Sequence, residues 1–392
     1  MTGRAGPVAP GLGRGDLRGG GAAAAPRPSG CVPRPAGPAP EPAPEPVFWP
    51  GGPAAGPAHS PARRRRPLAV LAGLGLILAL AVGLSLALGA RAVGWAEILS
   101  ALSGRSETLG EAAVASRIPR TQLGVLAGAA LAVSGAAMQG VARNPLADPG
   151  LMGVNAGASL AVVAGIVLLG IQSAQGFVWL AILGAGLAAA GVHLLAGLGR
   201  GGATPIRLAL AGTACAAAIG SVTTALVLPR NDVAGLVQSW HVGGLGGARA
   251  GTILTVLPFL AAGLVLALAA APRLNLLALG DETALALGQR IGRARALGLL
   301  GAVLLCGATT AACGPIGFVG LVVPHLGRAL IGTDYRWLMP FSALGGAALL
   351  LLADVAGRLV ARPAELEAGI VTALVGAPVF IWILRRRRVA GT

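Results

Sequence analysis

The sequence contains no lysine, and all 30 of its basic residues are arginine. A Walker A phosphate loop needs a lysine that reaches the β- and γ-phosphates of a nucleotide. This chain therefore cannot hold ATP in such a loop. If ATP drives the protein, another subunit must hydrolyse it.

Motifs of metal sites and hydrolytic centres are also missing. The four histidines are scattered, the four cysteines form no C-x-x-C pair, and neither H-E-x-x-H nor G-x-S-x-G occurs. Three of the cysteines lie in apolar runs, where a cysteine usually acts as a small buried hydrophobe. We therefore expect no catalytic residues and no metal site in this chain.

Charged residues are scarce and apolar residues are abundant. Only 11% of the chain is charged, whereas 55% is hydrophobic and the mean hydropathy is +0.77. Several runs reach the roughly 20 apolar residues that cross a bilayer. The net charge of +16 would suggest nucleic acid in a soluble chain, but here the arginines gather at the ends of apolar runs, as in Arg63–Arg66 and Arg385–Arg388. The composition predicts an all-α, multi-spanning membrane protein that binds no nucleic acid.

Ten apolar runs are predicted to be transmembrane helices. They cover residues 68–90, 118–139, 151–171, 176–198, 206–228, 251–271, 295–313, 316–332, 338–357 and 366–384. Residues 1–62, rich in proline, glycine and alanine, cannot bury a core and are predicted to be a disordered tail before the transmembrane domain, 63–388. An even number of spans puts both termini on one side of the membrane, and the arginine clusters assign that side to the cytoplasm.

Two segments resemble each other and indicate an inverted internal repeat. LAGAALAVSGAAMQG (126–140) and LLGAVLLCGATTAACG (299–314) share the same spacing of small residues. A proline- and glycine-containing break follows each of them, NPLADPG in the first case and GPIG in the second. The first span would run inward and the second outward, as an inverted repeat requires.

The stretch GPIGFVGLVVPHLGR (314–328) places glycines and prolines inside an apolar region. We expect a short, kinked and closely packed helix there. Pro315 is predicted to begin the helix and Pro324 to bend it. Gly314, Gly317 and Gly320 recur every three residues, and they are predicted to form one smooth face that another helix approaches closely.

Arginines at predicted external span ends allow two interpretations. They can extend to lipid headgroups, or they can form a basic rim that docks an acidic partner. Arg117 and Arg120 flank Pro119, which is predicted to start a span. Arg358 follows Asp354 by one helical turn, so the two side chains can form a local ion pair.

The predicted cytoplasmic loop LNLLALGDETALALGQRIGR (274–293) is too long and too regular for a simple turn. Its apolar residues are spaced as in an amphipathic helix pair that is broken at Gly280. Such a helix either lies on the membrane or receives a partner protein. A partner is favoured because the chain has no ATP site of its own.

Longer blocks of the sequence resemble the permeases of ABC importers for iron chelates and cobalamin. The matching blocks are, in chain order, 117–159, 238–245, 277–288, 314–358 and 363–384, and the resemblance covers about 68–388. It implies ten transmembrane helices, a second permease subunit that is identical or paralogous, a dimer of cytoplasmic ABC ATPases and an external solute-binding protein. It also implies that ATP and Mg are bound by the ATPase and that this chain holds no cofactor.

The resemblance also carries site residues over by position. Arg117, Arg120 and Arg358 resemble the family's arginines that meet acidic residues on the binding protein. The 274–292 loop resembles the coupling helices that seat in the ATPase. The residues that match the pattern of that loop are Gly280, Glu282, Ala286, Leu287 and Gly288. The sequence departs from the family at Asp281, where glutamate is more usual, and at Glu367, where proline is more usual.

The predicted function is that of a non-catalytic permease subunit in the cell membrane, working by alternating access while partner subunits hydrolyse ATP. A ferric siderophore is the favoured cargo, and haem and cobalamin remain alternatives. The competing hypothesis is an ion-coupled secondary transporter of a small solute, because inverted repeats and broken helices suit it equally well. Only Asp354 among the acidic residues falls inside a predicted span, which disfavours an ion pathway.

Overall fold

The computed structural model describes residues 61–89, 93–104, 107–150, 152–198, 205–362 and 364–389. These residues belong to the compact unit Gly51–Thr392, and they form helices and connections with no strand among them. The predicted tail lies outside the described residues, apart from its last two. The all-helical fold is confirmed for the part of the chain that the structure describes.

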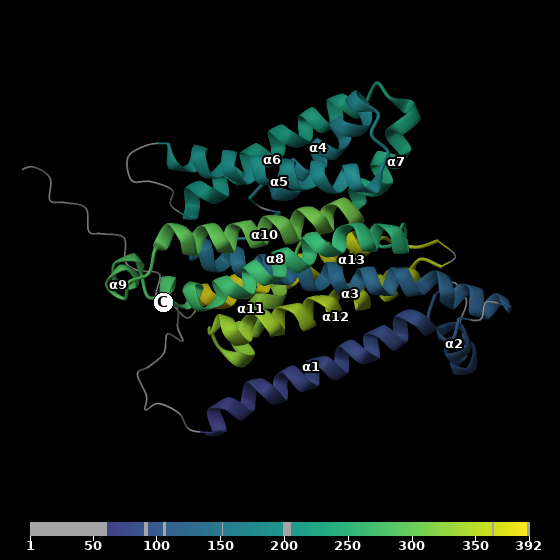
Figure 1. Ribbon diagram of the computed structural model, residues 1–392, viewed down its shortest axis with the longest axis horizontal. Helices are drawn as coiled ribbons and strands as arrows, with labels where there is room; N and C mark the ends of the chain where they lie inside the picture. Colours follow the sequence, from purple (N-terminus) through teal and green to yellow (C-terminus); the bar gives the residue numbers. More distant parts are fainter. Residues whose placement is uncertain are drawn as a thin grey trace, which may run out of the picture. The chain divides into compact units, whose positions relative to one another are not determined.

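Ten of the helices coincide with the ten predicted spans (Figure 1). Seven are long and apolar enough to cross a membrane: α1 (Pro61–Ala87), α3 (Leu109–Ala142), α5 (Ala174–Gly197), α6 (Pro205–Val227), α8 (Ala250–Leu277), α10 (Ile291–Cys313) and α12 (Tyr335–Val360). Three have shorter apolar stretches: α4 (Val154–Leu169), α11 (Val319–Ile331) and α13 (Ala368–Val389). The other helices of the described ranges are α2 (Trp95–Leu102), α7 (Asn231–Val242) and α9 (Asp281–Ala286), and they lie in the connections between spans.

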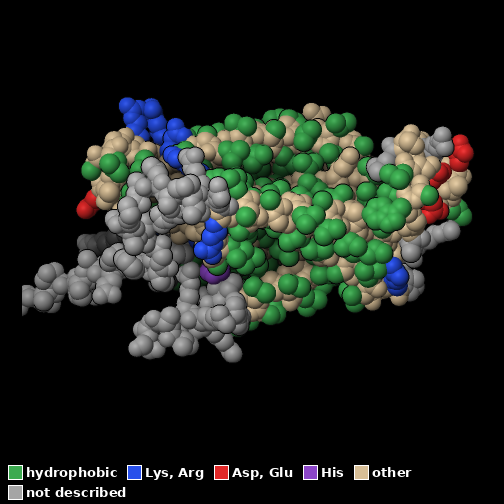
Figure 2. All heavy atoms as spheres, turned by 90° about the horizontal axis from the view of Figure 1, so that it is seen from below, with side chains coloured by type: hydrophobic (Ala, Val, Ile, Leu, Met, Phe, Trp, Pro, Cys, Tyr) green, Lys and Arg blue, Asp and Glu red, His purple; other side chains and the backbone are tan. Residues whose placement is uncertain are grey.

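The outer surface of the bundle is apolar. Figure 2 shows hydrophobic side chains over the middle of the helices and charged side chains gathered at the two ends. Large apolar residues on the outside of α1 and α5 stay uncovered, including Leu76 at 63%, Leu80 at 59% and Leu187 at 65% exposure. Lipid hydrocarbon accepts such a surface, and helices suit it because each satisfies its own backbone hydrogen bonds.

Helix α3 lies at the centre of the fold and packs against α1, α8, α10, α11 and α12. Glycine makes its closest contacts possible. A Cβ atom added to Gly128 would lie 2.3 Å from the carbonyl oxygen of Gly346 in α12, and one added to Gly135 would lie 2.0 Å from that of Gly320 in α11. Close backbone approach supplies the dispersion contacts that hold helices together in lipid. Gly320 thus lies in a close helix contact of the kind predicted for it.

Helices α3 and α10 are each followed by a break and a short apolar helix. Residues 143–153 connect α3 to α4, and residues 314–318 connect α10 to α11. In Figure 1, α3 and α10 run in opposite directions through the bundle, and so do α4 and α11. These opposite directions are the arrangement that an inverted repeat predicts.

The predicted start of the helix at Pro315 is wrong, because α11 begins at Val319. Gly314 ends α10 with φ 72°, and Phe318 precedes α11 in the left-handed region with φ 67°. The backbone between them packs against the connection after α7. A Cβ on Gly243 would lie 2.3 Å from the carbonyl oxygen of Pro315. Close contact with this distant loop, rather than the local proline signal, decides where the helix begins.

The expected smooth glycine face of this helix is wrong for the same reason. Gly314 and Gly317 lie outside α11, so they share no helix face with Gly320. Pro324 does lie inside α11, where it is buried. Gly314 and Gly317 therefore belong to the tight non-helical segment before α11, whereas Gly320 allows the close contact of α11 with α3.

Pro119 does not start a span, because α3 begins about three turns earlier at Leu109. Thr108 caps the helix by accepting a hydrogen bond from the backbone N–H of Glu111 at 3.2 Å. The Glu111 carboxylate accepts a hydrogen bond from the Thr108 N–H at 3.0 Å in return. This reciprocal capping box is a stronger signal for the start of a helix than Pro119 is. Helix α3 therefore begins well before the predicted span.

Candidate functional site

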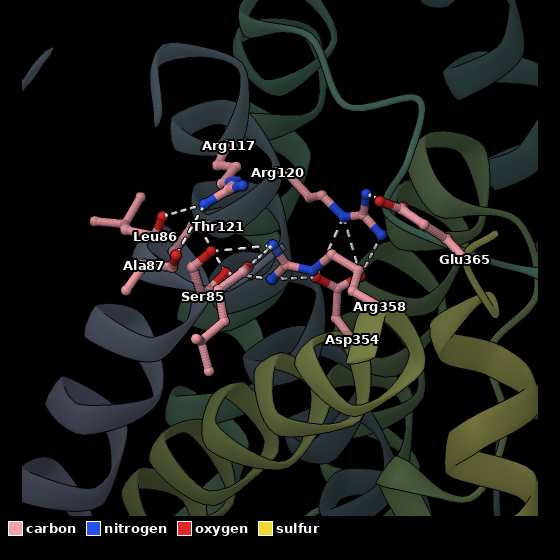
Figure 3. Close-up of polar contacts among 10 residues, drawn as sticks. Ser85, Leu86, Ala87, Arg117, Arg120, Thr121, Asp354, Arg358 and Glu365 are labelled. Carbon is pink, nitrogen blue, oxygen red and sulfur yellow. Dashed lines mark hydrogen bonds and ion pairs between the residues drawn. The ribbon is translucent and has the colours of Figure 1, made fainter. Parts of the chain in front are cut away.

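One end of the bundle carries a group of interacting charged side chains (Figure 3). The last turns of α1 and α12 and the first turns of α3 meet there, so we call it the arginine end. The charged group, here named the arginine cluster, consists of Arg117, Arg120, Asp354, Arg358, Arg362 and Glu365.

Arg120 joins two carboxylates of different exposure. Its Nε lies 3.1 and 3.2 Å from the two carboxylate oxygens of Asp354, and its Nη2 lies 2.8 Å from Asp354 Oδ1. Its Nη1 donates to Glu365 Oε2 at 2.6 Å. The Asp354 side chain is fully buried, whereas that of Glu365 is 40% exposed. Arg120 therefore holds one interior and one surface carboxylate with charge-assisted hydrogen bonds.

Asp354 also pairs with Arg358 on its own helix. Arg358 Nη2 lies 2.9 Å from Asp354 Oδ2, and the two side chains are 2% and 0% exposed. The ion pair predicted from their spacing is confirmed. Asp354 thus balances two guanidinium groups in a buried site, where an unpaired charge would be costly.

Arg117 donates to the end of α1. Its Nη1 hydrogen-bonds to the carbonyl oxygens of Leu86 at 2.8 Å and Ala87 at 3.1 Å. The last carbonyl groups of a helix have no partner within the helix, and they form the negative end of its dipole. A buried guanidinium therefore satisfies these acceptors and complements their charge.

Two further arginines cap the same helix end from the other side. Arg358 Nη1 donates to the carbonyl oxygens of Ser85 at 3.0 Å and Leu88 at 2.8 Å. Arg358 Nη2 also donates to the Ser85 hydroxyl at 3.0 Å. Arg362 Nη2 donates to the carbonyl oxygen of Gly89 at 2.7 Å. The end of α1 thus receives hydrogen bonds from Arg117 of α3, from Arg358 of α12 and from Arg362 just after α12.

The arginines predicted to dock a binding protein are therefore engaged inside the chain. Arg117 and Arg358 do not form an exposed rim, because they are 8% and 2% exposed. Arg120 retains a side-chain exposure of 13%. The structure brings the three residues together at one end, as their positions predicted, and their role in docking stays a prediction.

The predicted coupling loop lies at the opposite end of the bundle, which we call the α9 end. Gly280 precedes α9 with φ 102°, so the break predicted there is confirmed, and Gly288 follows α9 with φ 78°. The loop residues matched by resemblance all lie in α9 or beside it: Gly280, Glu282, Ala286, Leu287 and Gly288. The apolar side chains of Leu285 and Leu287 are 59% and 58% exposed.

Asp281 connects α9 to two spans. Its carboxylate lies 3.4 Å from Arg143 Nη2 at the end of α3 and 3.0 Å from Arg295 Nη2 in α10. These side chains are about 40% exposed, so each pair contributes little stability by itself. Their position matters more, because they link the loop to two long helices.

A buried acidic residue in the first break was missed by sequence reasoning. Asp148 is 8% exposed, and its Oδ2 accepts a hydrogen bond from the Gly150 N–H at 2.9 Å. A Cβ on Gly320 would lie 2.8 Å from Asp148 Oδ1, so this carboxylate faces the first turn of α11. Asp148 lies outside the predicted spans, yet it is buried among the helices as Asp354 is. The sequence signal that could have revealed Asp148 is its place in NPLADPG, a proline- and glycine-containing break within an apolar region.

The described ranges contain no group of three or more His, Cys, Asp or Glu side chains that could hold a metal ion. In the arginine cluster and around Asp281, charged side chains form ion pairs and helix caps. An apolar helical bundle with charged ends, in which two long helices are each followed by a break and a short helix, defines the class: a multi-pass membrane transport protein.

The FecCD transport family model matches residues 77–386. The chain belongs to the FecCD transport family. It is 44% identical over 321 residues to the ferric enterobactin transport system permease protein FepD of Escherichia coli K12, with 81% of this chain and 96% of the relative covered. It is 42% identical over 282 residues to the hemin transport system permease protein HmuU of Yersinia pestis, with 69% and 82% covered.

A solved structure shares the fold. It is a metal-chelate type ABC transporter in an inward-facing conformation, with a TM-score of 0.69 and 28% identity. The similarity covers 81% of this chain and 99% of the solved chain. Since the family consists of permease subunits of ABC import systems, this chain is a transport component rather than a catalyst.

Proposed function

We propose that this chain is the permease subunit that carries a ferric siderophore into the cytoplasm in an ABC importer. The observation that supports this cargo most is the 44% identity to the ferric enterobactin permease over 81% of the chain. A probable siderophore permease of Bacillus subtilis, YfiZ, is 40% identical over the same share. The hemin permease and a cobalamin permease of Halobacterium salinarum are 42% and 40% identical, so haem and cobalamin are the competing cargoes.

The α9 end is the proposed seat of an ABC ATPase dimer, which binds the ATP and Mg that this chain does not hold. Exposed apolar side chains at Leu285 and Leu287 offer a contact for a partner groove. The ion pairs of Asp281 with Arg143 and Arg295 link that contact to α3 and α10. Motion of the ATPase can therefore reach both of these long helices.

The remaining partners follow from the orientation of the bundle in the membrane. The α9 end faces the cytoplasm, and both chain termini lie on that side of the cell membrane. The arginine end, which carries Arg117, Arg120 and Arg358, faces outward and receives a solute-binding protein. A second permease subunit, identical or paralogous, completes the passage, and lipid surrounds the rest of the apolar surface.

One observation favours a second candidate function, ion-coupled secondary transport. Asp148 is a buried carboxylate in the break between α3 and α4, facing the first turn of α11. Ion-coupled transporters use acidic residues at such places. This hypothesis predicts uptake that depends on an ion gradient instead of a partner ATPase.

Reconstitution in proteoliposomes tests the cargo. The full-length chain is combined with the ABC ATPase and the solute-binding protein of its transport system, and labelled ferric siderophore, haem and cobalamin are offered separately. We expect ATP-dependent accumulation of the ferric siderophore only. Complexes with an ATPase variant that binds but does not hydrolyse ATP are the control. Preferential uptake of haem or cobalamin would overturn the proposed cargo.

A further inference from the structure

The contacts within the arginine cluster differ in how readily they can be exchanged. Arg117 and Arg358 are buried and donate to carbonyl oxygens at the end of α1. If either arginine turned toward an external partner, those carbonyls would lose their hydrogen-bond donors, and a buried acceptor without a partner is costly. These two arginines therefore hold α1 more firmly than they could hold a partner.

Arg120 is different because one of its partners lies at the surface. Its Nε and Nη2 contact the buried carboxylate of Asp354, and its Nη1 contacts the partly exposed carboxylate of Glu365. Glu365 lies outside the helices, in the connection before α13, so its side chain can move away without breaking a helix. A partly exposed ion pair is also weak.

An incoming carboxylate can replace Glu365 on Arg120 without changing the rest of the cluster. The exchange substitutes one carboxylate for another on Nη1, so the charge around Arg120 remains balanced. Asp354 keeps its contacts with Arg120 and Arg358, and the capping of α1 is unchanged. Within the arginine cluster, Glu365 is the partner whose replacement disturbs the fold least.

We propose that Glu365 occupies the position on Arg120 that a carboxylate of the docked solute-binding protein takes, so that docking proceeds by carboxylate exchange. This inference rests on the proposed function, and it adds a residue that controls the docking affinity. When no partner is bound, Glu365 neutralises Arg120 and keeps its guanidinium paired. When a partner docks, Glu365 is released, and its release lowers the affinity and keeps docking reversible.

The test uses the complete permease–ATPase complex in nanodiscs and the siderophore-loaded binding protein of the same system. Glu365→Gln removes the competing charge, and we expect the dissociation constant of the binding protein to fall by about two- to five-fold. Glu107→Gln is the matched control, because Glu107 is an exposed acidic residue near the same end and no contact with Arg120 is found for it. It removes the same charge without freeing Arg120, so its effect should be smaller.

A second pair of variants asks whether the effect passes through Arg120. With Arg120→Gln in the background, Glu365→Gln should no longer tighten binding. Glu365→Asp, which keeps the negative charge, should bind the partner with an affinity closer to that of the wild type. A merely structural role of Glu365 would not produce this dependence on Arg120.

The possible failures are distinguishable. If the wild-type complex binds no solute-binding protein, the docking part of the proposed function fails and the exchange fails with it. If the wild type binds but Glu365→Gln tightens binding no more than Glu107→Gln does, only the exchange is overturned. The same holds if Glu365→Gln tightens binding equally in the Arg120→Gln background.

Discussion

Neutralising Asp354 should be the most damaging single change in the arginine cluster. Its fully buried carboxylate contacts Arg120 at 2.8 to 3.2 Å and Arg358 at 2.9 Å. In Asp354→Asn one oxygen can still accept a hydrogen bond, but Arg358 loses the only carboxylate found to contact it within the described residues. Removing one partner of a buried ion pair costs about 3–5 kcal/mol, and we expect a loss in this range.

Glu365→Gln is the matched comparison, because Glu365 pairs with the same Arg120 but is 40% exposed. An exposed pair contributes only about 0.2–1 kcal/mol. The assay is the free energy of unfolding in mixed detergent micelles, with both variants measured against the wild type. If Asp354→Asn costs no more than Glu365→Gln, then Asp354 does not carry the charge balance described here, and the reasoning is refuted.

Two further predictions concern close packing and pH. Gly135→Ala should lower the free energy of unfolding by about 1–3 kcal/mol, because its Cβ would lie 2.0 Å from the Gly320 carbonyl oxygen. Gly191→Ala, where no atom lies within 4 Å of the new Cβ, should be neutral or stabilising, and equal losses in the two variants would contradict the packing argument. Burial raises the pKa of Glu367 above its ordinary value of 4.5, so the folded chain binds this proton more tightly and loses stability as pH rises through the raised pKa. Glu367→Gln should therefore melt at a higher temperature than the wild type at neutral pH, and the difference should disappear below about pH 4.5; a constant difference across thermal scans would oppose this assignment.

The spans could be predicted because lipid imposes a simple rule on sequence. A helix that crosses hydrocarbon needs a long apolar run. The ten predicted runs coincide with ten helices, and seven of these are long and apolar enough to cross a membrane. Helix ends inside the protein obey other constraints. The start of α11 at Val319 depends on contact with Gly243, a residue far away in the chain, and local proline and glycine signals do not contain that information.

The location of the arginine cluster could be predicted from the sequence, but the burial of its side chains could not. The predicted topology was enough to place Arg117, Arg120 and Arg358 at one end of the bundle. Their burial depends on where α1 ends, because its last carbonyl groups lie between α3 and α12 and accept hydrogen bonds from these side chains. Asp148 was missed because a break in an apolar run looks like a surface loop, whereas in the structure it turns back among the helices.

The energy source of transport tests the central claim most directly. Proteoliposomes that contain the chain with its ATPase and loaded binding protein are given either ATP without any ion gradient, or a proton or sodium gradient without ATP. The account predicts uptake of labelled ferric siderophore with ATP alone and none with a gradient alone. Uptake that a gradient drives in the absence of ATP would contradict the assignment of this chain as an ABC-importer permease.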